Sequence, residues 1–428
     1  MNPTAIEAHA KFVLLQWMII IAAAWVFGRL GKKLGQPLAV GEILAGILLG
    51  PSALGLIWPA DWPVLFPKET QQSLQLLGKL GLILLLFQVG MEFDYGHLRS
   101  RSKTVTAVSL LGIIAPFICG ILIGPWLHRE FAPDLPKFGF QLFLCIALSI
   151  SALPIMGRIL LEMKLERTVI GAMGISAAAI DDVVGWILLA LATALVTSGF
   201  DGWALLRQVV GVLVFFLVLQ KAIGPGLRWA WRRSQERSGG QGMSVSFLTL
   251  LLIVLFGSCL VSNRLGVFAI FGAFLLGVSL HQQLDLVKAW RERFSDFVLV
   301  AMVPIFFTNT GLNTSIGSLN TWSLWLGCAV VMLAAVAGKL GGCFVGARLT
   351  GQSPREAGCI AALMNTRALM GLVAINIGLD LKLLNREMFT MLVIMALLTT
   401  AMTGPLLRWL LPAELKNPLS VGKSDKPV

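Results

Sequence analysis

The chain has 428 residues, of which 57% are hydrophobic and 13% are charged, and its formal net charge at pH 7 is +12. Soluble globular proteins are about 45–50% apolar and about 25% charged, because a globule needs a polar surface toward water. The composition therefore argues against a water-soluble enzyme and excludes disordered, collagen-like and coiled-coil chains. It assigns the positive charge to membrane topology rather than to nucleic-acid binding.

Apolar stretches of membrane-spanning length, about 20 residues each, recur along the chain between polar breaks. Thirteen spanning helices are predicted, at about 12–30, 38–57, 71–93, 103–126, 138–162, 168–198, 203–222, 243–263, 265–281, 292–312, 322–348, 355–378 and 387–411. The longest polar segment between them, about 223–242, is predicted to be a loop too short for a soluble domain. We expect neither a cleaved signal peptide nor a regulatory domain at either end.

The distribution of Lys and Arg indicates the orientation of these helices. With the N-terminus outside, 22 of the 34 basic residues fall in inner loops, 8 fall outside and 4 fall within the spans. Because cytoplasmic loops carry the excess of Lys and Arg, this predicts an external N-terminus and a cytoplasmic C-terminus. Thirteen helices also divide into six, one linker helix and six of opposite orientation, which predicts an inverted repeat.

Polar residues interrupt the second and fifth predicted helices. Glu42 is a lone acid among small residues in the run LAVGEILAG, and we interpret it as a packing or gating residue rather than an ion ligand. In the run LSISALPIM, the apolar pattern is interrupted by Ser149, Ser151 and Pro154. Proline cannot donate a hydrogen bond to the carbonyl four residues before it, so a break near mid-helix is predicted.

The sixth predicted helix carries two adjacent acids, Asp181 and Asp182, near the middle of the run ISAAAIDDVVGWILL. Neighbouring residues on a helix point about 100° apart, so the two carboxylates are expected to do different work. Buried acids in a membrane are costly and are seldom only structural. We favour a proton and cation site over a pair of structural ion-pair partners.

The eleventh predicted helix contains Lys339 in the run AAVAGKLGGCFVG, with no acid in the same helix. A buried ammonium needs a partner, and Asp181 or Asp182 is the natural candidate. The alternative is a lysine that extends along its helix to reach water at the inner end.

The twelfth predicted helix is interrupted by Asn365, Thr366 and Arg367 in the run ALMNTRALMG. The fifth and twelfth helices occupy equivalent positions in a repeat of six helices, a linker and six helices. Two broken helices at matching repeat positions are typical of a transport site at the membrane midplane.

The cysteines and histidines do not indicate a metal or cofactor. All six cysteines lie in apolar runs without C-x-x-C spacing, and the four histidines fall in loops or at helix ends. Small buried thiols behave as hydrophobic residues, and no metal-ligand set is assembled. We therefore expect no cofactor and no metal beyond a transported ion.

Five sequence runs together carry a resemblance to a known family: GEILAGILLGPSALG, LLLFQVGMEFD, IDDVVGW, VPIFFTNTGL and MNTRALMGLVAINIGL. In this order they resemble the monovalent cation:proton antiporter-2 family, which includes Kef-type potassium efflux systems, bacterial Na⁺/H⁺ antiporters and plant cation/H⁺ exchangers. The resemblance covers the second to the thirteenth predicted helix.

The resemblance implies a division into two domains. The dimerisation domain would hold residues 1–102 and 243–312, the core domain 103–198 and 313–412, the linker helix and cytoplasmic loop 199–242, and the cytoplasmic tail 413–428. The fifth and twelfth helices would be unwound and would cross at mid-membrane. The core domain would move as an elevator against its partner domain.

The resemblance also assigns roles to the buried charges. Asp182 matches the ion- and proton-carrying aspartate, Asp181 matches the variable acid before it, and Lys339 matches its usual partner. Two acids with this lysine are typical of electrogenic exchangers. Kef-type members differ at the first acid and carry a nucleotide-binding domain, so the chain departs from that branch. The choice between Na⁺ and K⁺ stays open.

The predicted function is a homodimeric secondary antiporter that exchanges Na⁺ or K⁺ for protons at Asp182. Its predicted location is the plasma membrane, and more specifically a bacterial inner membrane. Serine hydroxyls and backbone oxygens of the fifth helix would complete the ion shell. One alternative is a potassium efflux component that conducts without proton coupling. A second alternative, an organic anion symporter of related fold, would bind its coupling ions without a proton-exchanging carboxylate, so the Asp181–Asp182 pair argues against it. An enzyme is the least favoured alternative, because the sequence shows no nucleophile–base set and no metal motif.

Overall fold

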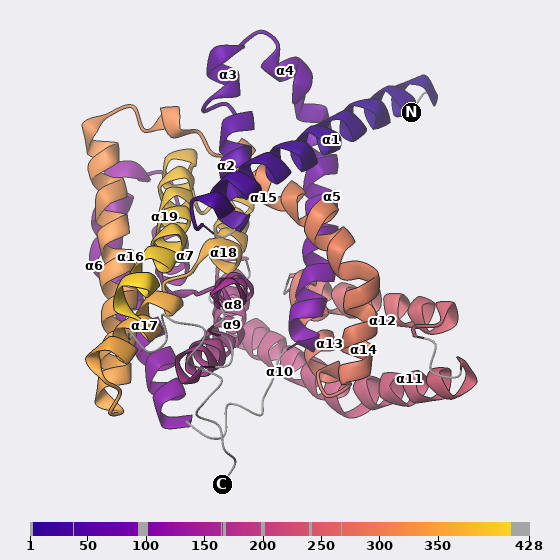
Figure 1. Cartoon of the computed structure of the whole chain (residues 1–428). Coiled ribbons are helices and arrows are strands. Elements are labelled where there is room, and N and C mark those ends of the chain that lie inside the picture. Colours follow the sequence, from indigo (N-terminus) through magenta and orange to yellow (C-terminus); the bar gives the residue numbers. More distant parts are fainter. Residues whose placement is uncertain are drawn as a thin grey trace. The chain divides into compact units, whose positions relative to one another are not determined.

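The computed structural model describes residues 3–36, 38–92, 102–163, 165, 168–197, 202–238, 242–266 and 268–411. Every regular element within these ranges is a helix, as the apolar pattern predicts (Figure 1). Ten of the helical segments are long and apolar enough to cross a membrane, and α17 with α18 forms a further bent candidate. The chain is therefore a multi-pass, all-helical membrane protein.

The helices have the following bounds. Helices α1 to α9 are Pro3–Lys33, Leu38–Leu49, Leu54–Ile57, Trp62–Leu65, Lys68–Met91, Ser102–Phe131, Lys137–Ser149, Leu153–Glu162 and Val169–Thr197. Helices α10 to α19 are Gly202–Val218, Gly224–Ser238, Val245–Arg264, Ala269–Leu280, Leu284–Trp290, Val303–Leu312, Trp322–Leu349, Pro354–Met364, Ala368–Asp380 and Arg386–Leu410. Stretches of π-helix lie at Leu219–Ile223, Arg291–Ser295 and Val298–Met302, and a 3₁₀ turn at Ile316–Ser318.

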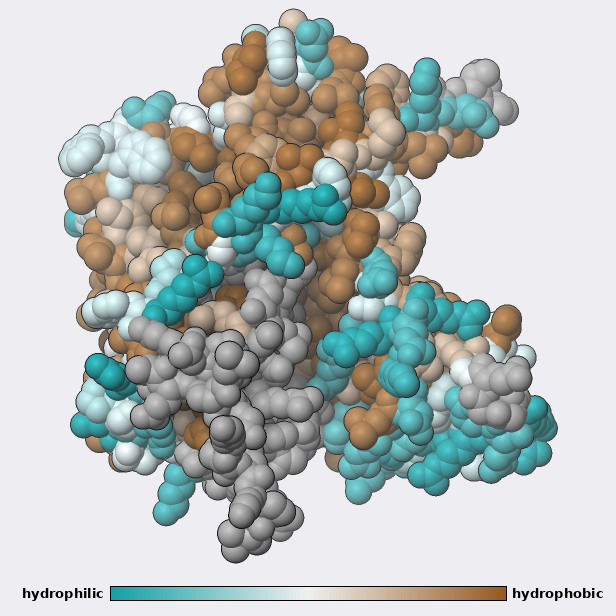
Figure 2. Space-filling model, viewed as in Figure 1, coloured by the Kyte–Doolittle hydropathy of each residue, from teal (hydrophilic) through white to brown (hydrophobic). Residues whose placement is uncertain are grey.

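The prediction of a polar loop over about 223–242 is wrong for most of that segment. Helix α11 occupies Gly224–Ser238 and continues from α10 through the π-helical stretch Leu219–Ile223. Arg, Gln and Glu are good helix formers, so the polarity of this segment reports exposure to water rather than an irregular backbone. Hydrophilic residues gather over α11 and α14, at the lower right of Figure 2.

Apolar side chains remain exposed along several of the long helices, as the broad brown areas of Figure 2 show. Trp25 on α1, Leu217 on α10 and Ile253 on α12 are each more than half exposed. Contiguous exposed apolar surface of this extent is expected where helices face lipid.

The chain divides into two compact units. The first comprises residues 1–25, 45–94 and 186–313, and the second comprises 26–44, 95–185 and 314–428. In the first unit α5 packs against α13, where Gly90 and Gly277 face each other. A Cβ at either position would meet backbone atoms of the other helix. Small residues at such a crossing allow membrane helices to approach closely.

In the second unit α6 and α16 pack side by side in the same way. Gly338, Gly342 and Gly346 lie one turn apart on α16, and a Cβ at any of them would meet the α6 backbone. This close approach also places Lys339 beside α6, since a Cβ on Gly112 would lie 3.7 Å from its ammonium nitrogen. The packing of two helices therefore positions a buried charge.

Two interruptions of regular helix lie in the second unit. Helix α7 ends at Ser149 and α8 begins at Leu153, and Ile150 between them has an extended backbone. This break precedes Pro154, which is the second residue of α8, where a missing N–H costs no helical hydrogen bond. Helix α17 ends at Met364 and α18 begins at Ala368, with a bend of 41° between them.

Candidate ion-binding site

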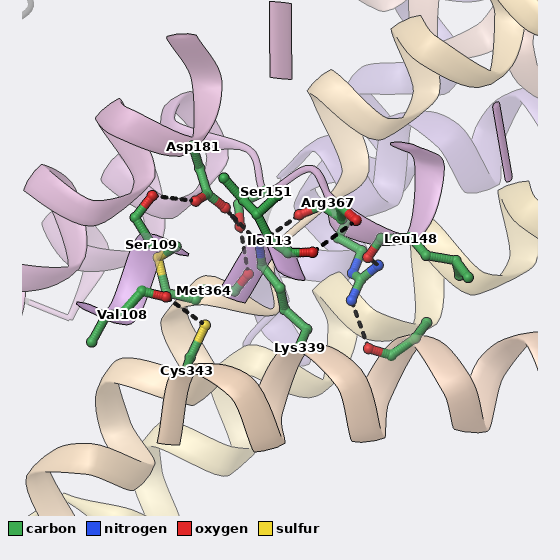
Figure 3. Close-up of polar contacts among 12 residues, drawn as sticks. Val108, Ser109, Ile113, Leu148, Ser151, Asp181, Lys339, Cys343, Met364 and Arg367 are labelled. Atoms are coloured by element: carbon green, nitrogen blue, oxygen red, sulfur yellow. Dashed lines mark hydrogen bonds and ion pairs between the residues drawn. The ribbon is translucent and has the colours of Figure 1, made fainter. Parts of the chain in front are cut away.

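The polar residues predicted from the sequence converge in the second unit, between α6, α9, α16 and the two helix breaks (Figure 3). Asp181, Asp182 and Lys339 are each at most 1% exposed. Charges this deep in apolar helices are costly unless other groups compensate them. The contacts of each charge therefore define what the site can do.

Asp181 on α9 has both carboxylate oxygens engaged. Ser109 of α6 donates a hydrogen bond to Oδ1 at 2.8 Å. Ser151, between α7 and α8, donates to Oδ2 at 2.9 Å, and the Lys339 ammonium contacts the same oxygen at 2.5 Å. Charge-assisted bonds of this kind are the strong ones in proteins, so Asp181 is held firmly in place.

Lys339 on α16 is fully buried and points at Asp181. Its ammonium also donates to the backbone carbonyl of Ser149, at the end of α7, at 2.6 Å. In this arrangement the side chain does not reach water, so the alternative of a snorkelling lysine does not describe it. The lysine instead joins α16 to α9 and to the α7–α8 break.

The two serines at the α7–α8 break contribute differently from each other. The Ser149 hydroxyl donates to the backbone carbonyl of Cys145 at 2.7 Å and lies 3.2 Å from that of Ile113, and it is the Ser149 carbonyl that faces the lysine. The Ser151 hydroxyl lies within hydrogen-bond distance of both Asp181 Oδ2 and the Met364 carbonyl, at 2.8 Å. A hydroxyl carries one proton, so Ser151 can donate fully to only one of them at a time.

Asp182 differs from its neighbour in having an oxygen to spare. The backbone N–H of Leu153, at the start of α8, interacts with its carboxylate. Its Oδ1 atom is buried and has no hydrogen-bond partner among the described residues. A buried, unsatisfied carboxylate oxygen carries a large desolvation cost, which a proton or a cation would relieve.

Arg367, between α17 and α18, provides a second buried positive charge. Its guanidinium donates to the carbonyls of Leu148, near the end of α7, and of Ala335 on α16, the latter at 2.6 Å. The last carbonyls of a helix lack partners within the helix, so at the end of α7 the arginine satisfies the Leu148 carbonyl and complements the helix dipole. Arg367 thus ties both helix breaks to α16.

The other two residues of the α17–α18 break face α19. Asn365 donates through its amide nitrogen to the Thr399 carbonyl at 3.5 Å, and the Thr366 hydroxyl lies 3.2 Å from that of Thr403. The Thr366 carbonyl accepts the backbone N–H of Ala152 at 2.7 Å. The two breaks are therefore in direct contact through their backbones.

Glu42 and a possible metal site are the remaining points of the sequence prediction. Glu42 is buried in α2 and is not among the residues that contact Asp181, so its packing or gating role stays a prediction. Within the described ranges no group of three or more His, Cys, Asp or Glu side chains is placed to hold a metal ion.

Ser109 and the α19 threonines were not identified from the sequence. Each is a single hydroxyl residue in an apolar helix, and such residues commonly satisfy a carbonyl of the preceding turn. The only available signal is the cluster Thr399, Thr400 and Thr403, which places hydroxyls at positions i, i+1 and i+4 of one helix. Thr403 lies beside each of the other two on the helix surface, because it is four residues after Thr399 and three after Thr400, whereas Thr399 and Thr400 point about 100° apart.

Known proteins resemble this chain over almost its whole length. The family model described as "Sodium/hydrogen exchanger, transmembrane" matches residues 18–413. The Na(+)/H(+) antiporter NhaS4 of Synechocystis sp. is 36% identical over 405 residues, which cover 94% of this chain and 97% of that protein.

Two further comparisons concern a plant protein and a solved structure. Cation/H(+) antiporter 20 of Arabidopsis thaliana is 37% identical over 407 residues, covering 92% of this chain but 48% of that protein, so the chain spans about half its length. The structure of the sodium proton antiporter MjNhaP1 from Methanocaldococcus jannaschii at pH 8 has a TM-score of 0.64 and covers 94% of this chain and 97% of that one. At 14% identity this last likeness concerns the fold.

Proposed function

The chain belongs to the family of transmembrane sodium/hydrogen exchangers, and from this premise we propose that it is a secondary antiporter that exchanges Na⁺ or K⁺ for protons at Asp182. The observation that carries the proposal is the contrast between the two adjacent acids. Asp181 has both oxygens engaged, whereas Asp182 keeps a buried oxygen without a partner. Only Asp182 is therefore ready to accept an exchangeable ligand.

The proposed cycle is competition between a proton and a dehydrated cation for the Asp182 carboxylate. A proton would bind Oδ1 directly, and a cation would add neutral oxygens from the α7–α8 break, where Ser151 supplies a hydroxyl. Either ligand removes the uncompensated charge, and a neutralised site crosses the membrane at lower cost than a charged one. This requirement couples cation movement to proton movement.

Charge balance decides whether the exchange is electrogenic. The Lys339–Asp181 pair carries no net charge, so among these three groups Asp182 holds the uncompensated charge. A proton and a monovalent cation then add the same charge at Asp182, so exchange at this group alone is electroneutral. We propose that cation loading also opens the Lys339–Asp181 pair and releases a proton from Lys339. The second proton would make the cycle electrogenic.

The larger architecture enters the proposal as well. We propose that the second unit corresponds to a core domain, that this domain moves as an elevator, and that the first unit serves in a homodimer. The α7–α8 and α17–α18 pairs would be broken membrane spans that cross near the midplane. With these pairs and the short apolar helix α13, the ten long segments would make thirteen spans with inverted repeats. The N-terminus would lie outside and the C-terminus in the cytoplasm, in a bacterial inner membrane.

The direct test is proton movement in proteoliposomes. With a pH gradient across the vesicles, pulses of Na⁺, K⁺ and Li⁺ should dissipate the gradient, and the three ions together report cation choice. Asp182→Asn should lower the rate of cation-driven proton movement by at least about 100-fold, because an amide cannot exchange a proton for a cation. Asp134→Asn, which removes an exposed acid in the α6–α7 connection, is the matched control and should leave the response unchanged.

Two results would contradict this proposal. One is cation-driven proton movement that persists in folded, purified Asp182→Asn protein. The other is cation flux without any proton movement in the wild type, which would indicate the channel-like alternative.

A further inference from the structure

We propose that Thr400 of α19 is a positioning residue: its hydroxyl caps the N-terminus of α18 from another helix and so fixes the α17–α18 break against the acid pair. The cap itself is a claim about folding. Its effect on transport rests on the function proposed above.

The start of α18 has no cap from its own sequence. The N-cap residue is Arg367, and its side chain makes no capping hydrogen bond because it extends to Leu148 and Ala335. The first N–H groups of any helix have no partner within the helix. In a segment that is fully buried, leaving them unpaired would be strongly unfavourable.

Thr400 fills this role with its single hydroxyl. Its oxygen accepts the backbone N–H of Arg367 at 3.1 Å and that of Ala368 at 3.0 Å. The same hydroxyl donates to the Ala396 carbonyl at 2.8 Å. One donor and two acceptor sites are all that a threonine hydroxyl offers, so every one of them is used.

The cap is connected to the acids by a short series of contacts. Holding the first turn of α18 fixes the preceding residues, whose Met364 and Thr366 carbonyls bind Ser151 and Ala152. Ser151 in turn binds Asp181, and α8 begins two residues later at Leu153, whose backbone N–H lies near the Asp182 carboxylate. A displaced α18 start would therefore move groups that face the exchanging carboxylate.

The two half-helix N-termini consequently have different uses. The N-terminus of α8 interacts with a carboxylate that can change its ligand, whereas that of α18 is closed by a neutral hydroxyl. Helix N-termini attract anions. Closing one of them with Thr400 leaves the other to act on Asp182.

The test compares Thr400→Val, Thr400→Ser and Thr390→Val in the full-length protein. Valine keeps the shape of threonine but offers no acceptor, and serine keeps the hydroxyl. Thr390 lies on the same helix and is equally buried, but its hydroxyl bonds to the Ser315 carbonyl at 3.5 Å, away from the break. It therefore reports the general cost of the same substitution in α19.

The first measurement is amide hydrogen exchange, read in peptides that span residues 364–372. Loss of a helix cap should make exchange about five- to tenfold faster in Thr400→Val than in the wild type or in Thr400→Ser and Thr390→Val. Equal exchange in all four proteins would overturn the cap. This measurement does not depend on transport, so it stands even if the wild type moves no cation.

The second measurement is the cation dependence of proton movement in proteoliposomes. Thr400→Val should raise the half-saturating cation concentration about fivefold, and Thr400→Ser should restore it, because the site geometry is altered while folded protein remains. A change confined to the maximum rate and matched by Thr390→Val would show a purely structural residue and overturn the positioning role. A wild type without any cation response would instead refute the proposed antiport.

Discussion

The two helix breaks of the second unit are alike in form but differ in what their polar groups contact. The α7–α8 break presents the Ser149 carbonyl, the Ser151 hydroxyl and the Leu153 N–H to the charged side chains of α9 and α16. At the α17–α18 break, the side chains bind mainly backbone carbonyls and the threonines of α19. The first break contributes groups to the candidate ion-binding site, and the second break supports the first through hydrogen bonds.

This difference shows how a membrane protein can keep irregular backbone at depth. Unpaired backbone groups are too costly in an apolar environment, so each break must find partners. At the second break the partners are backbone carbonyls and threonine hydroxyls, which carry no charge. At the first break they include the carboxylates of Asp181 and Asp182, the second of which exchanges its ligand in the cycle proposed above. We therefore expect substitutions at the α7–α8 break to alter transport, and substitutions at the α17–α18 break to alter stability first.

The largest effect is expected from separating the Lys339–Asp181 pair. Lys339→Ala and Asp181→Ala should each cost about 3–5 kcal/mol, because each strands a fully buried charge. The double variant should lose much less than the sum of the two single losses. The measurement is thermal unfolding in detergent of four purified proteins: the wild type, the two single variants and the double variant. Together they form a double-mutant cycle.

Additive melting shifts in that cycle would mean that the two residues do not interact in solution. The electrogenic part of the proposal would then lose its structural basis, since it requires this pair to open on cation loading. Arg348→Ala, on the exposed end of α16, is the control for loss of a basic residue from the same helix.

A smaller effect distinguishes the two hydroxyls that bind Asp181. Ser151→Ala removes a group that contacts both Asp181 and the second break, whereas Ser109→Ala removes a contact with Asp181 alone. We expect Ser151→Ala to cost about 1–3 kcal/mol and to raise the half-saturating cation concentration. Ser109→Ala should cost about 1 kcal/mol and leave cation affinity nearly unchanged. An equal cation response in both variants would contradict a special role for the first break.

The charged residues of the site could be predicted from the sequence because a charge in an apolar helix is conspicuous. Asp181, Asp182 and Lys339 were identified in this way, and the structure places Lys339 against Asp181. The residues alone left open which of the two acids the lysine contacts, and only the family resemblance pointed to Asp181. That choice depends on the rotation of α9 about its axis, which a single apolar pattern without clear faces does not determine.

The neutral groups of the site could not be predicted in the same way. Thr249 bonds only to the carbonyl of the preceding turn, while Thr400 caps another helix, yet each is a threonine in an apolar run. Similarly, Ser149 was expected to offer its hydroxyl, whereas its carbonyl faces Lys339. Backbone groups are present at every residue, so only the tertiary structure shows which ones line a site.

The central claim is that one carboxylate, Asp182, holds either a proton or a cation. The most direct measurement is the half-saturating cation concentration for proton movement in proteoliposomes, determined between about pH 6 and about pH 8.5. Competition for one group requires this concentration to rise as the pH falls, approaching about tenfold per pH unit where protons occupy the site. A half-saturating concentration that is unchanged across this range would contradict a shared site at Asp182.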